Sequence, residues 1–576
     1  MIKTAELKAA SGKKKASLVL KNCQIINVLT TEIEKGDIAI ENGKIVGVGK
    51  YKGMKVIDLK GAYVAPGLID GHVHIESSMM VPHEFAKLVI PYGTTSVIAD
   101  PHEIANVFGI EGIKYMIESA KQVPLDVYMM IPSCVPATTF ETSGSKINAK
   151  DVAKLTKLDN ILGLGEVMNY RDVIGGKLDM LNKIKAMNEM PIDGHAPNLK
   201  GKQLNAYISA GIRTDHESTS VDELIEKTRR GLYVHLREGS QTRNVLDLLP
   251  GVNANNHHRI LFCTDDKHPE DILNEGHINY NANLAINYGL SPIWAIQMAT
   301  INIANAYCLA NTGAIAPGYN ADLIVFDSLM DIQPKQVYKS GVLVAENKKP
   351  LFTTVPLNHS DINHSVHFYP NEIDLRLPLS KPFVRVIGLV DNNVTTEEYH
   401  VSVTTENGYY QNNENDDLLK LAVIERHHYS NNVGKALVKG YGLKNGAVAM
   451  TIAHDSHNLI CIGDSDFDMK LAIEKIKEIQ GGIVIVNRGR IMNFLSLEVG
   501  GIMTENPYED VQIKLSQMEK QVRSMGVGPQ IVDPFLQLAF LSLPVIPKLK
   551  VTDMGLFDVD AFKLVPLEVG DEIELR

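Results

Sequence analysis

The chain has 576 residues, of which 44% are hydrophobic and 22% are charged, so it is long enough for two to four folded domains. Its net charge of -11 argues against a general nucleic-acid binder, which normally presents a basic face. Five scattered cysteines with no Cys-x-x-Cys pair argue against a thiolate zinc site and a disulfide framework. The chain shows no signal-peptide pattern and no apolar run of the ~18 residues that a membrane helix needs. We therefore expect a cytoplasmic protein with no membrane partner.

In chain order, an N-terminal segment, 1–16, is followed by β-branched runs separated by turn signals over residues 17–65. β character returns over 311–380, and we expect these two stretches to form one small composite β-sandwich domain. Residues 66–310 alternate short apolar strands with amphipathic stretches in eight units, which predicts a TIM-like (β/α)8 barrel. Residues 381–576 mix strands, helices and glycine-containing turns, and they are interpreted as a C-terminal α/β domain.

The first predicted barrel strand ends in His72-Val73-His74. A strand has a side-chain period of two, so both imidazoles point to the same side. Two neutral imidazoles on one face are half of a metal site. A bare His-x-His is also compatible with a surface strand end, so its meaning depends on residues further along the chain.

Further polar residues stand at the ends of later predicted strands. Because the carboxyl ends of barrel strands meet on the face that carries active sites, we expect these residues to lie together with the first pair. Each one alone has a structural explanation, but the set favours a metal centre. The six predicted metal ligands are His72, His74, Glu166, His195, His216 and Asp265. Imidazole with carboxylate suits two divalent ions, Zn²⁺, Fe²⁺ or Mn²⁺, and ligand softness alone does not choose among them. Glu166 has two oxygens with which to bridge the two ions.

Such a centre predicts hydrolysis without a covalent enzyme intermediate. Two ions that share a water molecule would lower its pKa from ~15.7 towards ~7. Asp265 would hold the resulting hydroxide, accept its proton and pass it to a leaving group. No nucleophile elbow, P-loop or dinucleotide-binding glycine motif competes with this interpretation.

The segment Pro66–His74 is similar to the first-strand motif of the amidohydrolase superfamily. The single histidines of the fifth and sixth strands, the aspartate of the eighth strand and the segment Gly313–Leu323 resemble the same superfamily. One departure is informative, because many relatives place a carboxylated lysine at the fourth strand, where this chain has Glu166.

Longer segments resemble the bacterial adenine deaminases within that superfamily, over nearly the whole chain. They are Ile98–Val107, Gly165–Asn169, Asp193–Pro197, Thr214–Ser218, Arg237–Ser240, Cys263–Asp266, Thr451–Asn458 and Leu541–Pro547. The resemblance implies hydrolysis of adenine at C6 to hypoxanthine and ammonia, a reaction of purine salvage. Adenine would be the small-molecule partner.

Three carboxylates are the predicted catalytic residues: Asp265, Glu166 and Glu103, of which Glu103 could reach the metals or N1 of the substrate. The predicted substrate contacts are Glu217, Ser218, Arg237, Glu238, His454, Asp455 and His457. The last three would act if the C-terminal domain closes over the barrel mouth. The alternative for them is a capped turn.

Two other interpretations stay open. One is a different cyclic amide hydrolase or a purine or pyrimidine deaminase, such as a hydantoinase-like or guanine-type enzyme. The other is a non-catalytic scaffold, whose mark would be a degraded site, whereas every expected ligand position is filled here. We expect a homo-oligomer, with a dimer as the working prediction.

Overall fold

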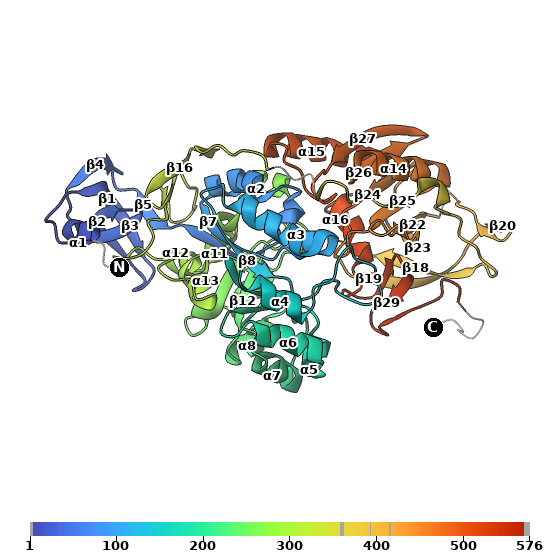
Figure 1. Ribbon diagram of the computed structural model, residues 1–576, viewed down its shortest axis with the longest axis horizontal. Helices are drawn as coiled ribbons and strands as arrows, with labels where there is room; N and C mark the ends of the chain where they lie inside the picture. Colours follow the sequence, from blue (N-terminus) through green and yellow to red (C-terminus); the bar gives the residue numbers. More distant parts are fainter. Residues whose placement is uncertain (1–3, 358–361, 392, 414–415, 570–576) are drawn as a thin grey trace.

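The computed structural model describes residues 4–357, 362–391, 393–413 and 416–569 (Figure 1). The N-terminal strands lie at one end of the molecule, the barrel lies in the middle, and the C-terminal domain lies at the other end. Residues 1–3 and 570–576, the outer ends of the predicted terminal segments, lie outside the described residues, as do short pieces at 358–361, 392 and 414–415.

The region from Leu68 to Cys263, all of which is described, contains the eight strands of the predicted (β/α)8 barrel. Its parallel strands are β6 (Leu68–Val73), β7 (Thr94–Ala99), β8 (Asp126–Ile131), β9 (Ile161–Val167), β10 (Ile192–Gly194), β11 (Thr214–Asp215), β12 (Tyr233–Arg237) and β13 (Ile260–Cys263). They form two arcs, β6 to β10 and β11 to β13. A parallel bridge between Val73 and Asp265 joins the arcs on one side, and Arg213 N–H donates to the Ile192 carbonyl (3.0 Å) on the other. The barrel is therefore closed, and its strand ends meet at one mouth.

Helices cover the outside of the barrel (Figure 1). They are α2 (Pro82–Val89), α3 (His102–Ala120), α4 (Ala149–Leu155), α5 (Tyr170–Ile174), α6 (Leu178–Ala186), α7 (Gly201–Ser209), α8 (Val221–Arg229), α9 (Val245–Leu248), α10 (Pro269–Asn274), α11 (Ile278–Tyr288), α12 (Pro292–Met298) and α13 (Ile301–Ala306). Every position of β6 and β7 is buried, as expected for parallel strands covered on both faces. Across the described part of the chain, no helix has the length and apolar character needed to cross a membrane.

The strands before and after the barrel share one sheet, next to helix α1 (Thr4–Ala10). The strands are β1 (Ala16–Asn27), β2 (Glu32–Glu41), β3 (Lys44–Gly49), β4 (Gly53–Asp58), β5 (Tyr63–Pro66), β14 (Leu323–Phe326), β15 (Gln336–Lys339), β16 (Val342–Glu346) and β17 (Lys349–Pro350). Antiparallel pairing of β5 with β14 joins the two stretches, with Pro66 opposite Leu323 and Tyr63 opposite Phe326. This composite sheet holds both ends of the barrel segment together.

The C-terminal domain is built on a second large sheet. Its strands, in spatial order, are β19 (Thr396–Ser402), β18 (Phe383–Leu389), β23 (Val433–Lys439), β22 (Leu418–Ile424), β25 (Leu459–Gly463), β24 (Gly446–Met450), β26 (Gly482–Asn487) and β27 (Arg490–Ser496). The helices are α14 (Asp466–Ile479), α15 (Tyr508–Ser524) and α16 (Pro534–Ala539), and the smaller strands are β20 (Thr405–Glu406), β21 (Tyr409–Tyr410), β28 (Leu549–Thr552), β29 (Gly555–Asp558) and β30 (Lys563–Leu564).

The segment around residues 366–375 differs from the predicted domain division. Val366, Phe368, Ile373 and Leu375 are buried in the same apolar cluster as residues of β22, β25 and α14. The segment thus packs with the C-terminal sheet, although the sequence placed it in the composite domain. Its polar flanks conceal this packing in the sequence, because the partner residues come from strands that are distant along the chain.

The C-terminal domain contacts the barrel mouth through a loop between β24 and β25, residues Thr451–Asn458, called here the 451–458 loop. The Asn458 amide donates to the Thr142 carbonyl (2.8 Å), and Thr142 N–H donates to the Asp553 carboxylate (2.9 Å). All eight residues of the loop are buried. The loop is therefore part of the interface between the two domains.

Candidate metal centre

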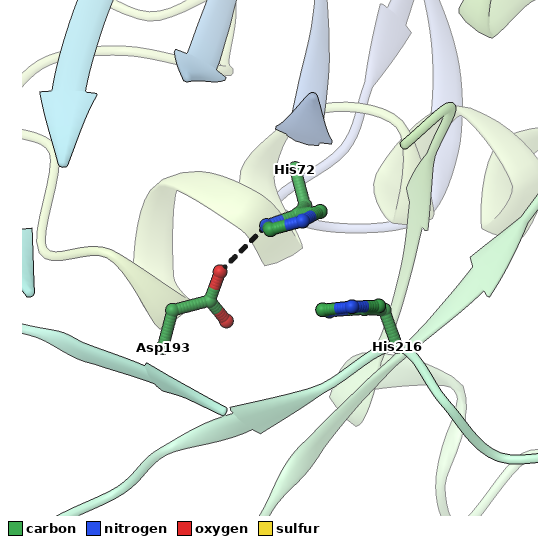
Figure 2. Close-up of side chains that lie close together, drawn as sticks. All are labelled: His72, Asp193 and His216. Carbon is green, nitrogen blue, oxygen red and sulfur yellow. Dashed lines mark hydrogen bonds and ion pairs between the residues drawn. The ribbon is translucent and has the colours of Figure 1, made fainter. Parts of the chain in front are cut away.

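His72 and His74 present their Nε2 atoms to a common point. His72 Nδ1 lies 2.8 Å from Asp193 Oδ2, and His74 Nδ1 lies 2.9 Å from the Asp100 carbonyl (Figure 2 shows the first contact). Both partners only accept hydrogen bonds, so each Nδ1 carries a proton and each Nε2 is the ring atom that faces the common point. The two Nε2 atoms lie 3.2 Å apart. A cation bound at this point would take the place of protons on the two Nε2 atoms and use their lone pairs.

Glu166, at the end of β9, divides its two oxygens between two histidine pairs. Oε1 lies 3.2 Å from His74 Nε2 and 3.9 Å from His72 Nε2. Oε2 lies 2.7 Å from His195 Nδ1 and 3.3 Å from His216 Nε2. One carboxylate therefore connects two separate groups of imidazole nitrogens, as a bridging ligand does.

Asp265 follows β13 and completes the first group. Its Oδ1 lies 3.1 Å from His74 Nε2 and 3.7 Å from His72 Nε2, while its Oδ2 accepts a hydrogen bond from Arg237. Burial alone would raise the pKa of Asp265, but the Arg237 guanidinium and the imidazoles hold it well below its usual range. The backbone of Asp265 is left-handed, with φ of 61°, a conformation that aspartate tolerates better than most side chains. Asp265 is thus an ionised carboxylate in a fixed position.

The carboxylates of the cluster stabilise positive charge on the imidazoles around them. Burial lowers the pKa of an imidazole, yet the Asp193 carboxylate raises the pKa of His72 to about 9. The pKa of His195 also rises to about 9 against burial, because Glu217 and Glu166 lie nearby. Burial would raise the pKa of Glu166, but the surrounding imidazoles hold it well below its usual range.

The donor set fits divalent metal ions. Ligands at about 2.0–2.2 Å from one ion lie roughly 3.0–3.5 Å from one another. The separations around the two oxygens of Glu166 run from 2.7 to 3.9 Å, close to that spacing. Five of the six predicted ligands fall in groups that could hold a metal ion: His72, His74 and Glu166; Glu166, His195 and His216; and His72 and His216 with Asp193. Asp265, the sixth, lies against His72 and His74.

Two supporting residues, Asp193 and Asp100, were not predicted from the sequence. Asp193 lies on β10 and His195 directly follows this strand, two positions later, so the period-2 rule that selected the histidines also points to this carboxylate. Burial would raise the pKa of Asp193, but His72 lowers it to about 2. The Asp100 carboxylate accepts the Glu166 N–H (2.9 Å), and a side chain at Gly165 would clash with it at 2.0 Å. Glycine at 165 is therefore what lets Asp100 fix Glu166.

Glu103 lies at the start of α3 and contacts the C-terminal domain. Its Oε1 lies 2.8 Å from His454 Nδ1 and 3.0 Å from His102 Nε2, and its Oε2 accepts from His457 Nε2. His102 Nδ1 in turn lies 3.3 Å from Glu166 Oε1. The 451–458 loop is therefore only two side chains away from the metal ligands, as expected if the last domain covers the barrel mouth.

The remaining predicted contacts divide into two groups. Glu217 lies 3.5 Å from His216 Nε2 and pairs with Arg237, so both border the cluster. Ser218 and Glu238 have protein partners, and their contacts with substrate stay predictions. The Ser218 hydroxyl donates to Asp215 (2.9 Å) in a buried group with Lys227, and Glu238 lies 3.5 Å from Arg243.

Comparisons with known proteins agree with this geometry. The amidohydrolase family matches residues 63–349, and the adenine deaminase C-terminal domain matches residues 393–563. A Carboxydothermus hydrogenoformans protein named adenine deaminase 2 is 47% identical over 98% of this chain and 99% of its own length. Proteins named adenine deaminase from Clostridium acetobutylicum and Geobacillus kaustophilus are 47% and 44% identical over 97% and 98% of this chain, and over 99% and 98% of their own lengths.

Proposed function

Because the chain belongs to the adenine deaminase family, we propose that it hydrolyses adenine at C6 to hypoxanthine and ammonia, a reaction of purine salvage. The observation that carries the proposal is Glu166, whose oxygens face two different histidine pairs at the barrel mouth. A site with this donor set is suited to hydrolysis of a neutral ring substrate, which needs positioning and charge stabilisation.

The chain holds a divalent metal centre, and we propose two ions, Mn²⁺ or Fe²⁺ with Zn²⁺ as a further possibility. His72, His74 and Asp265 would hold the first, His195 and His216 the second, and Glu166 would bridge them. When bound, such ions make water acidic enough to attack at neutral pH. The imidazole–carboxylate pairs fix the ligands in place, as Asp193 does for His72.

Asp265 is the proposed proton carrier. Its Oδ1 faces the two histidines, while Arg237 keeps the carboxylate ionised and fixed through Oδ2. In this state Asp265 can accept the proton of the attacking water and deliver it to the departing amine. The bond between C6 and the amine nitrogen then breaks and ammonia leaves. The proton that remains on the attacking oxygen returns to the imidazole that protonated N1, and C6 becomes the carbonyl carbon of hypoxanthine.

Glu103 is the proposed route for the proton that N1 gains. Burial would raise its pKa, but His454, His102 and His457 hold it well below its usual range. Glu103 is therefore a carboxylate, and the proposed source of the proton for N1 is His102, an imidazole that contacts Glu103. Glu217 and Arg237 remain proposed substrate contacts at the edge of the cluster.

The expected cytoplasmic location and homodimer are further proposals. An intracellular base is the natural substrate of a salvage enzyme, and gel filtration with light scattering would test the dimer. A mass equal to one chain would remove that prediction without affecting the activity.

The activity has a direct test. Protein purified with Mn²⁺ or Fe²⁺ should convert adenine to hypoxanthine with one ammonia released per base, as followed by ultraviolet absorbance and an ammonia assay. Guanine and hydantoin serve as competing substrates. Turnover of either one without turnover of adenine would overturn the substrate assignment.

A further inference from the structure

The 451–458 loop carries two buried polar atoms that have no hydrogen-bond partner in the described part of the chain. They are His454 Nε2 and Asp455 Oδ2. The two residues are only 2% and 3% exposed. Buried polar groups are normally paired, so two orphan atoms on adjacent residues indicate that a ligand completes them.

Both side chains lie next to the proposed reaction centre. His454 Nδ1 contacts Glu103 Oε1 (2.8 Å), and its ring stacks on Phe540 with centroids 4.6 Å apart and an interplanar angle of 11°. Asp455 Oδ1 lies 3.8 Å from His102 Nε2, and His102 Nδ1 lies 3.3 Å from Glu166. The stacking fixes the plane of the His454 ring. The His102 imidazole lies between Asp455 and Glu166, the proposed bridging ligand.

The orphan atoms have opposite hydrogen-bonding character. The Glu103 carboxylate only accepts, so His454 Nδ1 carries a proton, and although burial lowers the pKa of His454, Glu103 raises it to about 9. At neutral pH the Nε2 atom is then also an N–H donor. Burial raises the pKa of Asp455 to about 6, which leaves Oδ2 mainly an ionised acceptor. The loop therefore offers one donor and one acceptor.

We propose that His454 Nε2 and Asp455 Oδ2 bind the purine edge opposite C6, with N3 accepting from His454 and N9–H donating to Asp455. This inference rests on the proposed function, because it assumes that C6 faces the metal ligands. Free adenine presents a neighbouring acceptor and donor at this edge, whereas a purine substituted at N9 has lost the donor. Asp455 would thus select the free base over nucleosides.

Analogues that each remove one ring contact test the proposal on the wild-type holoenzyme. We expect 9-methyladenine and 3-deazaadenine to lose roughly 10²-fold or more in kcat/KM relative to adenine, because a buried polar group is left unpaired. 7-Deazaadenine should lose much less. A wild-type enzyme that converts adenine and 9-methyladenine equally well would overturn the proposal while leaving the proposed function intact.

Variants then assign the contacts to residues. Asp455→Ala should lower kcat/KM for adenine but change that for 9-methyladenine by less than about threefold, so the discrimination collapses. His454→Ala should likewise remove the penalty on 3-deazaadenine. Asp553→Asn is the matched control, since Asp553 is a buried carboxylate at the same domain interface with Thr142 as its partner.

The outcomes separate cleanly. An unchanged adenine to 9-methyladenine ratio in Asp455→Ala, with the fold verified by circular dichroism, would refute the role of Asp455. If Asp455→Ala does not fold, Asp455→Asn keeps the shape, and a substantially weaker discrimination in that variant supports the proposal whereas the wild-type ratio contradicts it. Failure of the wild-type enzyme to convert adenine at all would instead refute the proposed function.

Discussion

The barrel half and the C-terminal half of the site are built differently. On the barrel side, carboxylates at the ends of other barrel strands hold the ligands by hydrogen bonds. Asp193 holds His72, and Asp100 holds Glu166. On the C-terminal side, the 451–458 loop is buried but leaves His454 Nε2 and Asp455 Oδ2 without partners among the described residues. The difference indicates that the barrel fixes the reacting groups in advance, whereas the loop keeps hydrogen-bonding capacity for the substrate.

The largest expected effect comes from removing the bridge. Glu166→Gln should lower kcat/KM for adenine by at least about 10³-fold and reduce bound metal, because a neutral amide replaces a shared carboxylate in the centre. Activity assays and elemental analysis of the purified variant measure both. Glu275→Gln is the matched control, since Glu275 is a glutamate of the barrel region that pairs with Arg243 and Lys267 and is not among the predicted site residues. Full metal content and activity in Glu166→Gln would show that the barrel half is not a bridged centre.

Asp265→Asn should separate proton transfer from metal binding. We expect kcat to fall by roughly 10²–10⁴-fold, as for removal of a general acid–base group, with less loss of metal than in Glu166→Gln. Asparagine also tolerates the left-handed backbone at this position, so the fold should persist. A variant with near wild-type kcat would exclude Asp265 as the proton carrier.

Asp193→Asn tests the support behind the ligands. Loss of the carboxylate partner of His72 should weaken metal affinity by about 10–100-fold, as is typical for such supporting groups. Activity should therefore recover when Mn²⁺ or Fe²⁺ is added in excess, which a titration of activity against metal would show. Loss of activity that excess metal does not restore would assign Asp193 a different role.

The sequence predicted the barrel half better than the C-terminal half. The six ligands stand at strand ends with a period of two, and local pattern is enough to place them on one face. Ser218 and Glu238 also follow strands, and their partners Asp215, Lys227 and Arg243 lie three to nine residues away along the chain. The strand-end pattern selects these positions, but it does not show which neighbouring side chain each one contacts.

The C-terminal half of the site shows more clearly what the sequence alone does not predict. The sequence identified His454, Asp455 and His457 as a polar cluster, but not which of their atoms would be left unpaired. That outcome depends on Glu103 and Phe540, which are distant along the chain. The packing of Val366 and Phe368 with the C-terminal sheet has the same origin, because four separate strands (β22, β24, β25 and β26) and helix α14 supply the other members of their cluster.

The smallest expected effect concerns the stability of the C-terminal half. Lys550 is buried, donates to the carbonyls of Val394 and Phe540, and has its pKa lowered by burial to about 7. An unfolded lysine has a pKa of about 10.4, so between these values the unfolded chain binds more protons and the free energy of unfolding rises with pH. Lys550 raises the free energy of unfolding by at most about 1.4 kcal/mol for each pH unit in this range.

Lys550→Met should therefore flatten the pH dependence. Thermal unfolding of the wild type and the variant at pH 7, 8 and 9 gives the slope of stability against pH for each protein. The difference between the two slopes removes the contributions of other titrating groups. Parallel slopes would mean that Lys550 keeps an ordinary pKa in the folded protein. The predicted change would show that folding releases the proton of Lys550 in this pH range.

The most direct test of the central claim is a metal titration of the metal-free protein. Mn²⁺ is added in steps, bound metal is measured by mass spectrometry, and conversion of adenine to hypoxanthine is followed in the same samples. The bridged arrangement around Glu166 predicts that activity rises with bound metal and saturates at two ions per chain. Full activity without metal, saturation at a single ion, or no conversion of adenine at any loading would contradict it.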